Sequence, residues 1–251
     1  LVLDHQESQA FLVCLAPKGD SATAEAWFAQ MERQLAAPLP TSKQEQSPAP
    51  FTLRLLRSRA QYLQDIARCQ QLLSDGESYE ICLTNQIQTD PIAEPLSLYR
   101  ALRTTNPAPY AAFLKLPGVS VLCSSPERFL RVERDGSVES KPIKGTRPRG
   151  ETEAQDQQLI DDLRSSEKDR SENLMIVDLL RNDLGQVCKV GSVHVPKLMQ
   201  VESYHTVHQL VSTVRGQLKA GLTATDCIRA AFPGGSMTGA PKQRTMRIIE
   251  Q

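Results

Sequence analysis

The dipeptide Asp135-Gly136 separates two short segments, 129–132 and 138–143, in which apolar and polar residues alternate. Asp-Gly between alternating segments is a strong signal for a two-residue β-hairpin turn. A hairpin makes its two strands antiparallel, and it needs further strands or a helix beside it to be stable. The sequence therefore predicts an antiparallel sheet in the middle of the chain.

The predicted turn also fixes which residues face one another across the hairpin. Arg134 pairs with Ser137, and the same register carried outward places Glu127 opposite Lys144. Directly opposed side chains have Cβ atoms about 5 Å apart. Pro142 cannot donate to the strand ladder, so a register shift near this end stays open. A Glu–Lys pair is thus expected at the open end of the hairpin.

Other segments have the periodicity and the boundary residues of further strands and helices. Strands are predicted at 11–15, 79–87, 110–116, 119–123, 187–190 and 204–218. Helices are predicted at 27–35, 58–75, 153–163, 166–183 and 225–231, with a last one from Pro241. Hairpins mixed with long helices indicate an α+β fold, in which helices cover the outer faces of antiparallel sheets.

A change of composition suggests how the chain is organised. Residues 36–50 contain four prolines among small and polar residues, which is typical of a stiff, exposed linker. Residues 1–35 are too few to fold well alone, and we interpret them as the remnant of an N-terminal domain. The chain begins with Leu1 and stops inside a helical pattern, so we expect it to be an internal piece of a longer protein.

Composition excludes several classes of partner. Lys plus Arg equals Asp plus Glu at 29 each, so the chain has no overall basic field for nucleic acid. No apolar run reaches the roughly 18 residues that a membrane helix needs. The six cysteines follow no metal-binding or disulfide spacing, which favours free thiols in a reducing compartment. We expect a cytoplasmic protein that binds neither nucleic acid nor membrane.

Lys144 lies in a strongly basic segment together with Lys141, Arg147 and Arg149. An ordinary cross-strand ion pair between Lys144 and Glu127 is one interpretation. A second is a reactive lysine whose neutral form is favoured by the neighbouring cations, with a carboxyl group nearby for proton transfer. A nucleic-acid-binding loop is a third, but the segment has no aromatic residues on which bases could stack.

Three more features have both a structural and a functional interpretation. Glu172 opens an almost wholly apolar helix and is a candidate Mg²⁺ ligand, with a salt bridge as the alternative. The small residues 233–239 precede a helix and suit either a bound anion or a tight turn. His208 does not belong to a zinc-binding spacing, so a hydrogen-bonded core histidine is its default interpretation.

A set of motifs together resembles the chorismate-utilising enzyme family, which includes the aminodeoxychorismate, anthranilate and isochorismate synthases. The motifs are S-P-E-R-F from Ser125, P-I-K-G-T-R-P-R-G from Pro142, S-E-N-L-M-I-V-D-L-L-R-N-D-L-G from Ser171, Y-H-T-V-H-Q-L-V-S from Tyr204 and F-P-G-G-S-M-T-G-A-P-K from Phe232. The resemblance implies an αββα sandwich of antiparallel sheets, in which residues 51–251 form a chorismate-binding catalytic domain.

The resemblance also implies catalytic residues. Lys144 matches the nucleophilic lysine of aminodeoxychorismate synthases, at a position where anthranilate synthases typically have Ala. Glu127 matches an acid/base glutamate, and His208 matches a histidine beside the reacting ring. Glu80 stands where isochorismate synthases have a water-activating Lys, which argues against water as the nucleophile.

Substrate and metal contacts follow from the same resemblance. Gly145 and Thr146 match backbone and hydroxyl contacts to the substrate, and Glu172 matches a ligand of the Mg²⁺ cofactor. The family's second metal-binding glutamate and its carboxylate-binding segments have no match before Gln251. We therefore expect the chain alone to be inactive.

The resemblance is greatest to component I of aminodeoxychorismate synthase. It implies amination of chorismate at C4 to 4-amino-4-deoxychorismate, a precursor of p-aminobenzoate and folate. The chain has no glutaminase signature, so ammonia is expected from a glutamine amidotransferase subunit or fused domain. Two alternatives stay open: component I of an anthranilate synthase, which is a lyase, and an inactive fragment or pseudoenzyme that only docks a partner.

Overall fold

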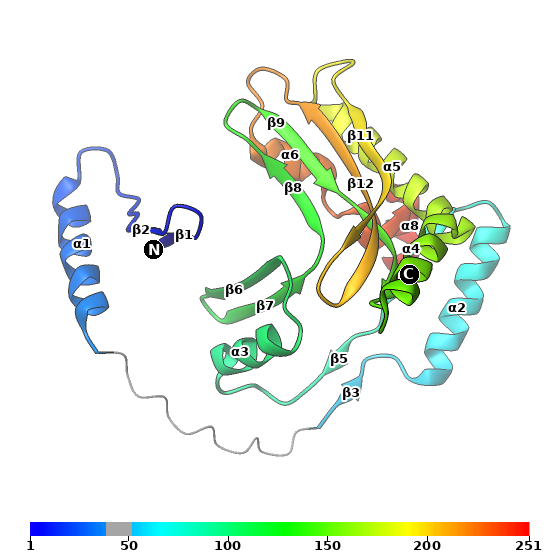
Figure 1. Cartoon of the computed structure of the whole chain (residues 1–251), viewed down its shortest axis with the longest axis horizontal. Helices are drawn as coiled ribbons and strands as arrows, with labels where there is room; N and C mark the ends of the chain where they lie inside the picture. Colours follow the sequence, from blue (N-terminus) through cyan, green and yellow to red (C-terminus); the bar gives the residue numbers. More distant parts are fainter. Residues whose placement is uncertain (39–51, 251) are drawn as a thin grey trace. The chain divides into compact units, whose positions relative to one another are not determined.

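The computed structural model describes residues 1–38 and 52–250, which belong to two compact units, Leu1–Pro50 and Phe51–Gln251 (Figure 1). In the first unit, strands β1 (Val2–Asp4) and β2 (Gln9–Phe11) form an antiparallel pair, followed by helix α1 (Ser21–Ala36). The predicted linker 36–50 lies mostly outside the described residues. The domain boundaries therefore stay predictions.

A five-stranded antiparallel sheet forms the centre of the second unit. Its long strand β12 (Val207–Gln217) pairs with β11 (His194–Ser203), β10 (Ile143–Pro148) and β9 (Ser137–Lys141). Strand β8 (Arg128–Val132) pairs with β9. Strands β9 and β10 follow one another along β12 and are separated by Pro142, which has no N–H to donate.

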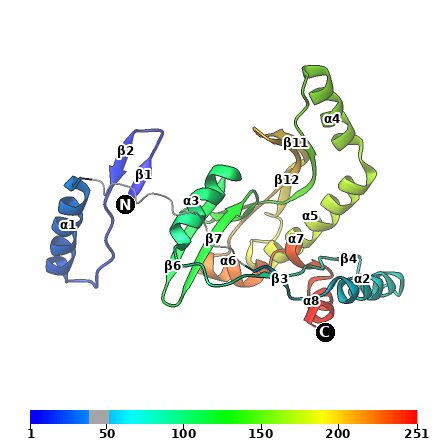
Figure 2. The same cartoon turned by 90° about the horizontal axis from the view of Figure 1, so that it is seen from below.

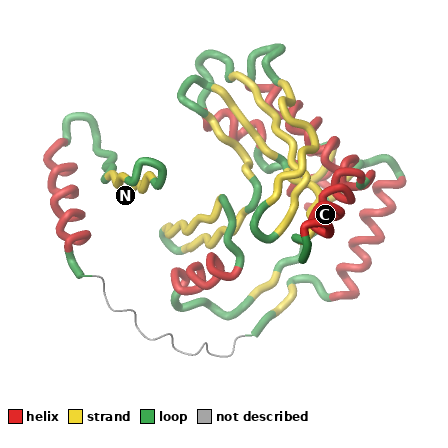
Figure 3. The backbone as a smooth tube through the Cα atoms, in the orientation of Figure 1, coloured by secondary structure: helices red, strands yellow, loops and turns green. Residues whose placement is uncertain are grey.

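Helices cover one face of this sheet. Helix α4 (Glu153–Ser165) and helix α5 (Glu167–Val187) contact β12, and helix α6 (Ala224–Ala231) packs on α5 (Figure 3). Their apolar side chains form the core with alternate residues of β12, such as Val214, which is fully buried. Burying one such side chain contributes about 1.5–3 kcal/mol, so this interface is the main source of stability.

A second antiparallel layer is formed by strands β6 (Tyr110–Leu116) and β7 (Val119–Ser125). Helix α3 (Pro95–Thr105) covers one face of this hairpin, where Tyr99 and Phe113 stack with ring centroids 5.5 Å apart. The two sheets with helices on their faces confirm the predicted α+β class, and the sequence prediction of 110–116 and 119–123 as strands is also confirmed.

Short elements join these layers. Helix α2 (Arg59–Ser74) follows strand β3 (Arg54–Leu55), which pairs with β5 (Ile87–Gln88). Strand β4 (Glu80–Ile81) pairs with β13 (Gly239–Ala240), which lies between the short helix α7 (Gly235–Thr238) and helix α8 (Lys242–Glu250) (Figure 2). No helix in the described part of the chain is both long and apolar enough to span a bilayer.

The prediction of a continuous strand over 79–87 is wrong. Only Glu80–Ile81 and Ile87–Gln88 are strands, and they belong to different sheets. Between them the Asn85 side chain accepts a hydrogen bond from the Arg57 backbone N–H and donates one to the Arg57 carbonyl. This side chain takes the place of a strand partner and interrupts the ladder.

The predicted two-residue turn is also wrong. The Glu133 N–H donates to the Ser137 carbonyl, so the loop contains three residues, and Gly136 takes the left-handed conformation with φ of 80°. This is the common three-residue hairpin loop with a glycine at its last position. Val132 consequently pairs with Val138, one residue away from the predicted register.

The last corrections concern the region after α4. Helix α5 runs through Gly185 and ends at Val187, and the predicted strand 187–190 is absent from the described residues. Strand β11 was not predicted, because Met199 has a positive φ and the register shifts on both sides of Lys197. These irregularities remove the two-residue periodicity that identifies a strand.

Candidate active site

Lys144 lies in β10 at a bulge, between the β10–β12 pairs Ile143–Val211 and Thr146–Gln209. Its Nζ is 2.6 Å from Oε1 of Glu80, and the two side chains are only 16% and 15% exposed. β-Bulges redirect side chains and are frequent next to active sites. The lysine is thus held in a sheltered position by a carboxylate from a segment 64 residues away in the sequence.

Gly145 makes this bulge possible. Its φ is 84°, and a Cβ atom at this position would lie 2.8 Å from the side chain of Asp169 on α5. Asp169 is nearly buried and forms an ion pair with Arg147 at 3.1 Å. Any larger residue would push the bulge away from α5, so the glycine and this ion pair together set the position of Lys144.

Glu127 approaches the same bulge from the segment that joins β7 and β8. Its Oε1 accepts a hydrogen bond of 2.8 Å from Ser236 Oγ, and its carboxyl group also contacts the backbone of Ile143. Burial raises the pKa of Glu127, while the two hydrogen bonds and the charge of Lys144 act in the opposite direction. Because burial dominates, this carboxyl group holds its proton more readily than an exposed glutamate does.

The predicted ladder contact between Glu127 and Lys144 is therefore wrong, although the two residues do come together. Lys144 belongs to a strand that pairs with β12, so it is not the cross-strand partner of Glu127, which immediately precedes β8. The carboxylate approaches the bulge beyond the end of β8, near enough for the Lys144 charge to act on it. The break at Pro142 accounts for this difference, because it ends the pairing of β8 with β9.

Thr146 lies on the sheet face that the helices do not cover. It pairs with Gln209 of β12, and directly opposed residues project from the same face. Gln209 is almost buried and was not predicted as a site residue. Alternation along β12 would have identified it, because a neighbour of a helix-facing residue must face the other side.

His208 does not belong to the cluster that Lys144 forms with Glu80 and Glu127, which we call the Lys144 cluster. Its ring is fully buried, Nε2 lies 2.9 Å from Oδ1 of Asp156, and Nδ1 lies 2.7 Å from Oγ of Ser203. Hydrogen bonds from Arg149, from the Gly150 backbone and from His208 hold the pKa of Asp156 well below its usual range. The default interpretation, a hydrogen-bonded core histidine, describes these contacts.

Glu172 lies on α5 and has Lys168 as its ion-pair partner, at 3.8 Å. Among residues 1–38 and 52–250 there is no group of three or more His, Cys, Asp or Glu side chains that could hold a metal ion. The donors in the described residues therefore do not form a complete Mg²⁺ site. A role for Glu172 as a single ligand stays a prediction.

The glycine-rich segment before α8 forms one wall of the lysine cluster. Ser236 on α7 holds Glu127, and β13 pairs with the strand that carries Glu80. Gly239 has a φ of 133°, and a Cβ atom there would overlap the Glu80 carbonyl. The segment thus places two carboxyl groups around one lysine, which is an arrangement suited to proton transfer and nucleophilic attack.

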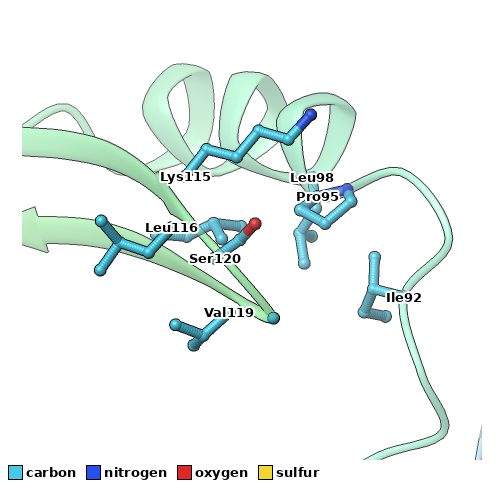
Figure 4. Close-up of a pocket in the computed structure, with 9 residues that line it drawn as sticks. Ile92, Pro95, Leu98, Lys115, Leu116, Val119 and Ser120 are labelled. Carbon is cyan, nitrogen blue, oxygen red and sulfur yellow. The ribbon is translucent and has the colours of Figure 1, made fainter.

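One apolar pocket lies away from these residues. The pocket drawn in Figure 4 has a volume of about 480 Å³ and lies between α3 and the β6–β7 hairpin. Its lining is mostly apolar, and Lys115 is its one charged side chain. It lacks the convergent titratable groups that the Lys144 cluster provides.

A profile of the chorismate binding enzymes matches residues 1–251. The chain belongs to the chorismate-binding enzyme family. It is 54% identical over its whole length to an aminodeoxychorismate synthase of Streptomyces pristinaespiralis, of which it covers 36%. It is 38% identical to the aminodeoxychorismate synthase component 1 of Bacillus subtilis, of which it covers 53%. The chain thus spans about half the length of these relatives, or less.

A solved structure shows the same fold. The anthranilate synthase component I of Streptococcus pneumoniae superposes with a TM-score of 0.85 at 30% identity, over 98% of this chain and 55% of that protein. The predicted architecture of antiparallel sheets with outer helices is therefore confirmed by the chain's own elements and by this relative.

Proposed function

We propose that this chain forms part of an aminodeoxychorismate synthase, which replaces the C4 hydroxyl of chorismate with an amino group to give 4-amino-4-deoxychorismate. The main structural support is the sheltered amine of Lys144, which lies near the carboxyl group of Glu127. The relatives named aminodeoxychorismate synthase match the whole chain, which supports the same reaction. The product would supply p-aminobenzoate and folate synthesis in the cytoplasm.

In this mechanism the neutral amine of Lys144 attacks C2 of chorismate. The C1=C2 electron pair moves to C1=C6, the C5=C6 pair moves to C4=C5, and the C4–O bond breaks. Glu127 gives its proton to the departing hydroxyl, which leaves as water. Burial raises the pKa of this carboxyl group and so favours the protonated form that the task requires. Ammonia then adds at C4, the double bonds shift back, and the C2–N bond to Lys144 breaks.

Substrate contacts are proposed for the residues beside Lys144. Thr146 is exposed on the face of the sheet that the helices leave uncovered, so its hydroxyl can donate to an oxygen of chorismate. Gly145 lets the backbone of the bulge approach a ligand closely, because it has no side chain. His208 has both ring nitrogens engaged, and we assign it the support of β12 rather than a proton-transfer step.

Mg²⁺ and a source of ammonia complete the proposal. The resemblance implies Mg²⁺ with Glu172 as one ligand, and because the described donors do not complete that site, no step above uses the metal. The relatives named component 1 imply a second component. We propose that this partner is a glutamine amidotransferase, as a subunit or a fused domain, which delivers ammonia.

The test is a product assay by liquid chromatography with the full-length protein, chorismate, Mg²⁺ and an ammonium salt. Aminodeoxychorismate as the product supports the proposal. Anthranilate would support the lyase alternative, which Lys144 disfavours. Absence of any product, while chorismate still binds, would support the pseudoenzyme alternative.

A further inference from the structure

The contact between Glu80 and Lys144 has no place in the mechanism above. Oε1 of Glu80 lies 2.6 Å from the Lys144 amine, and both side chains are largely buried. A lysine in water has a pKa of about 10.4 and is almost wholly protonated at neutral pH. The amine must lose a proton before it can attack carbon. Glu80 is the carboxylate that directly contacts this proton.

The other oxygen of Glu80 has an unusual environment. Oε2 is buried and has no hydrogen-bond partner among the residues that the structure describes. A buried carboxylate oxygen without a partner costs free energy, because it has lost water and gained nothing in exchange. Transfer of one proton from Lys144 to Glu80 removes both charges at once, and with them most of this cost. Glu80 can therefore accept this proton without leaving a buried charge behind.

Glu127 is not suited to remove this proton. Its carboxyl group already accepts hydrogen bonds from Ser236 and the Ile143 backbone, and burial raises its pKa, which favours its protonated form over the carboxylate that a base needs. The two carboxyl groups around Lys144 therefore have different partners: Glu80 contacts the lysine amine, and Glu127 accepts a hydrogen bond from Ser236. Two titratable groups in different environments commonly divide the acid and base roles of one reaction.

The backbone of Glu80 is fixed from three directions. Strand β4 pairs with β13, Ser78 Oγ donates to the Glu80 carbonyl at 2.9 Å, and Gly239 permits close approach of the two strands. Ser78 is itself buried and contacts Thr245 of α8. Such a rigid support holds a catalytic group within hydrogen-bond distance of its proton.

We propose that Glu80 is the general base that activates Lys144. Its Oε1 takes a proton from the Lys144 ammonium, so that an O–H bond forms as an N–H bond breaks, and the freed lone pair attacks C2 of chorismate. After attack, Nζ releases a second proton to the Glu127 carboxylate that remains when water has left. Glu80 returns its proton when the lysine is expelled. This inference rests on the proposed function.

The test measures the rate at which chorismate becomes attached to Lys144. The full-length protein is mixed with chorismate and Mg²⁺ without ammonia, quenched at intervals, and the Lys144 peptide is quantified by mass spectrometry. Glu80→Gln keeps a side-chain oxygen that accepts a hydrogen bond from Lys144 but cannot take a proton. We expect it to slow attachment at pH 7 by about 100-fold or more, with little change in the Kd for chorismate.

Higher pH separates a base from a positioning group. At higher pH, hydroxide in solution can remove the proton in place of the missing base, so the Glu80→Gln rate should rise toward that of the unsubstituted protein. A positioning role alone predicts nearly full attachment in Glu80→Gln at pH 7 and loss only in Glu80→Ala. That result would overturn the inference. Added formate should partly restore Glu80→Ala if a carboxylate base is what is missing.

The control is Glu77→Gln, three residues earlier, whose carboxylate pairs with Arg244 at 2.6 Å on the surface. We expect its attachment rate to equal that of the unsubstituted protein, and a similar fall in both variants would overturn the inference. If the unsubstituted protein makes aminodeoxychorismate without any Lys144 adduct, the covalent route of the proposed function fails. An adduct that forms equally fast in Glu80→Gln refutes the role of Glu80 alone.

Discussion

The two faces of the β10–β12 pair carry two clusters with similar components and different hydrogen bonding. On the helix-covered face, His208 is bound by a carboxylate and a hydroxyl, and both of its nitrogens have partners. In the Lys144 cluster, Oε2 of Glu80 has no hydrogen-bond partner within residues 1–38 and 52–250, and Glu127 has a raised pKa. Saturated hydrogen bonding is typical of structural groups, whereas incomplete hydrogen bonding and perturbed pKa values concentrate where chemistry occurs.

The role of a titratable residue near a site therefore depends on which hydrogen-bond partners its atoms already have. His208 and Lys144 both match residues implied as catalytic. Both nitrogens of His208 already have partners, whereas Lys144 lies beside a carboxylate that can still accept a proton. Substitutions in the Lys144 cluster should therefore lower activity, whereas substitutions around His208 should lower stability.

The largest effect is expected for Lys144→Ala. It removes the nucleophile, so amination should fall below detection and no adduct should form, while the Kd for chorismate changes little. Lys144→Arg should not restore activity, because a guanidinium stays charged at all accessible pH values. The measurement is the product assay with ammonium as nitrogen source.

Arg244→Ala serves as the control for Lys144→Ala, since it removes a cation that pairs with Glu77 on the surface. It should keep normal activity. Substantial amination by Lys144→Ala would contradict the assignment of the lysine as nucleophile.

The next effect is that of Glu127→Gln, which removes the acid and leaves a group of similar shape. We expect the turnover number to fall by about 100-fold or more. Because burial raises the pKa of Glu127, the protonated form that serves as acid is present at low pH and is lost as pH rises through that pKa. The alkaline fall in the pH–rate profile should therefore disappear in the variant.

The pH–rate profile of Ser236→Ala refines this prediction. Its hydroxyl donates to Glu127 and lowers the pKa of that group, so its removal should move the alkaline limb to higher pH. A limb that stays in place in both variants would show that another group titrates there.

In the second cluster, His208→Ala should affect stability more than chemistry. The substitution leaves a cavity and removes one of the three partners of the Asp156 carboxylate, which together cost about 2–4 kcal/mol. The free energy of unfolding in urea measures this cost. The exposed His194 is the matched control, and His194→Ala should change stability by less than about 0.5 kcal/mol.

The prediction would be contradicted if His208→Ala lost activity and kept its stability. If its unfolding midpoint is unchanged while turnover falls 1,000-fold, His208 acts on the substrate and the division between the two clusters fails. The His194→Ala variant must be measured in the same series to exclude an effect of losing any imidazole.

The sequence predicted the class of fold, most helices and the β6–β7 hairpin, because these depend on local periodicity and caps. Ser58, for example, caps α2 as its motif predicts. The register of the hairpin was predicted wrongly because it depends on the type of turn, and Gly136 ends a three-residue loop. Resemblance identified Lys144 and Glu127 as partners without giving the route by which they meet.

The contact of Glu80 with Lys144 could not be predicted, for a physical reason. It depends on the short pairing of β4 with β13, which joins segments far apart in the chain. A strand of two residues has no periodicity of its own, and its position is set by Gly239 and by the packing of α8. Tertiary contacts of this kind leave no local pattern in the sequence.

The smallest effect concerns Asp156 and the acid stability of the helix-covered face. Its hydrogen bonds with Arg149, Gly150 and His208 lower the pKa of Asp156 in the folded state. A lowered pKa contributes stability that is present above the unfolded value of about 3.9 and is lost as pH falls toward the folded value. Asp156→Asn should therefore be less stable than the unsubstituted protein at pH 6, and the difference should be smaller at pH 3 and smaller still at lower pH. Urea unfolding at a series of pH values measures this difference, and an equal difference at pH 6 and pH 3 would show that the ionised carboxylate contributes nothing through these bonds.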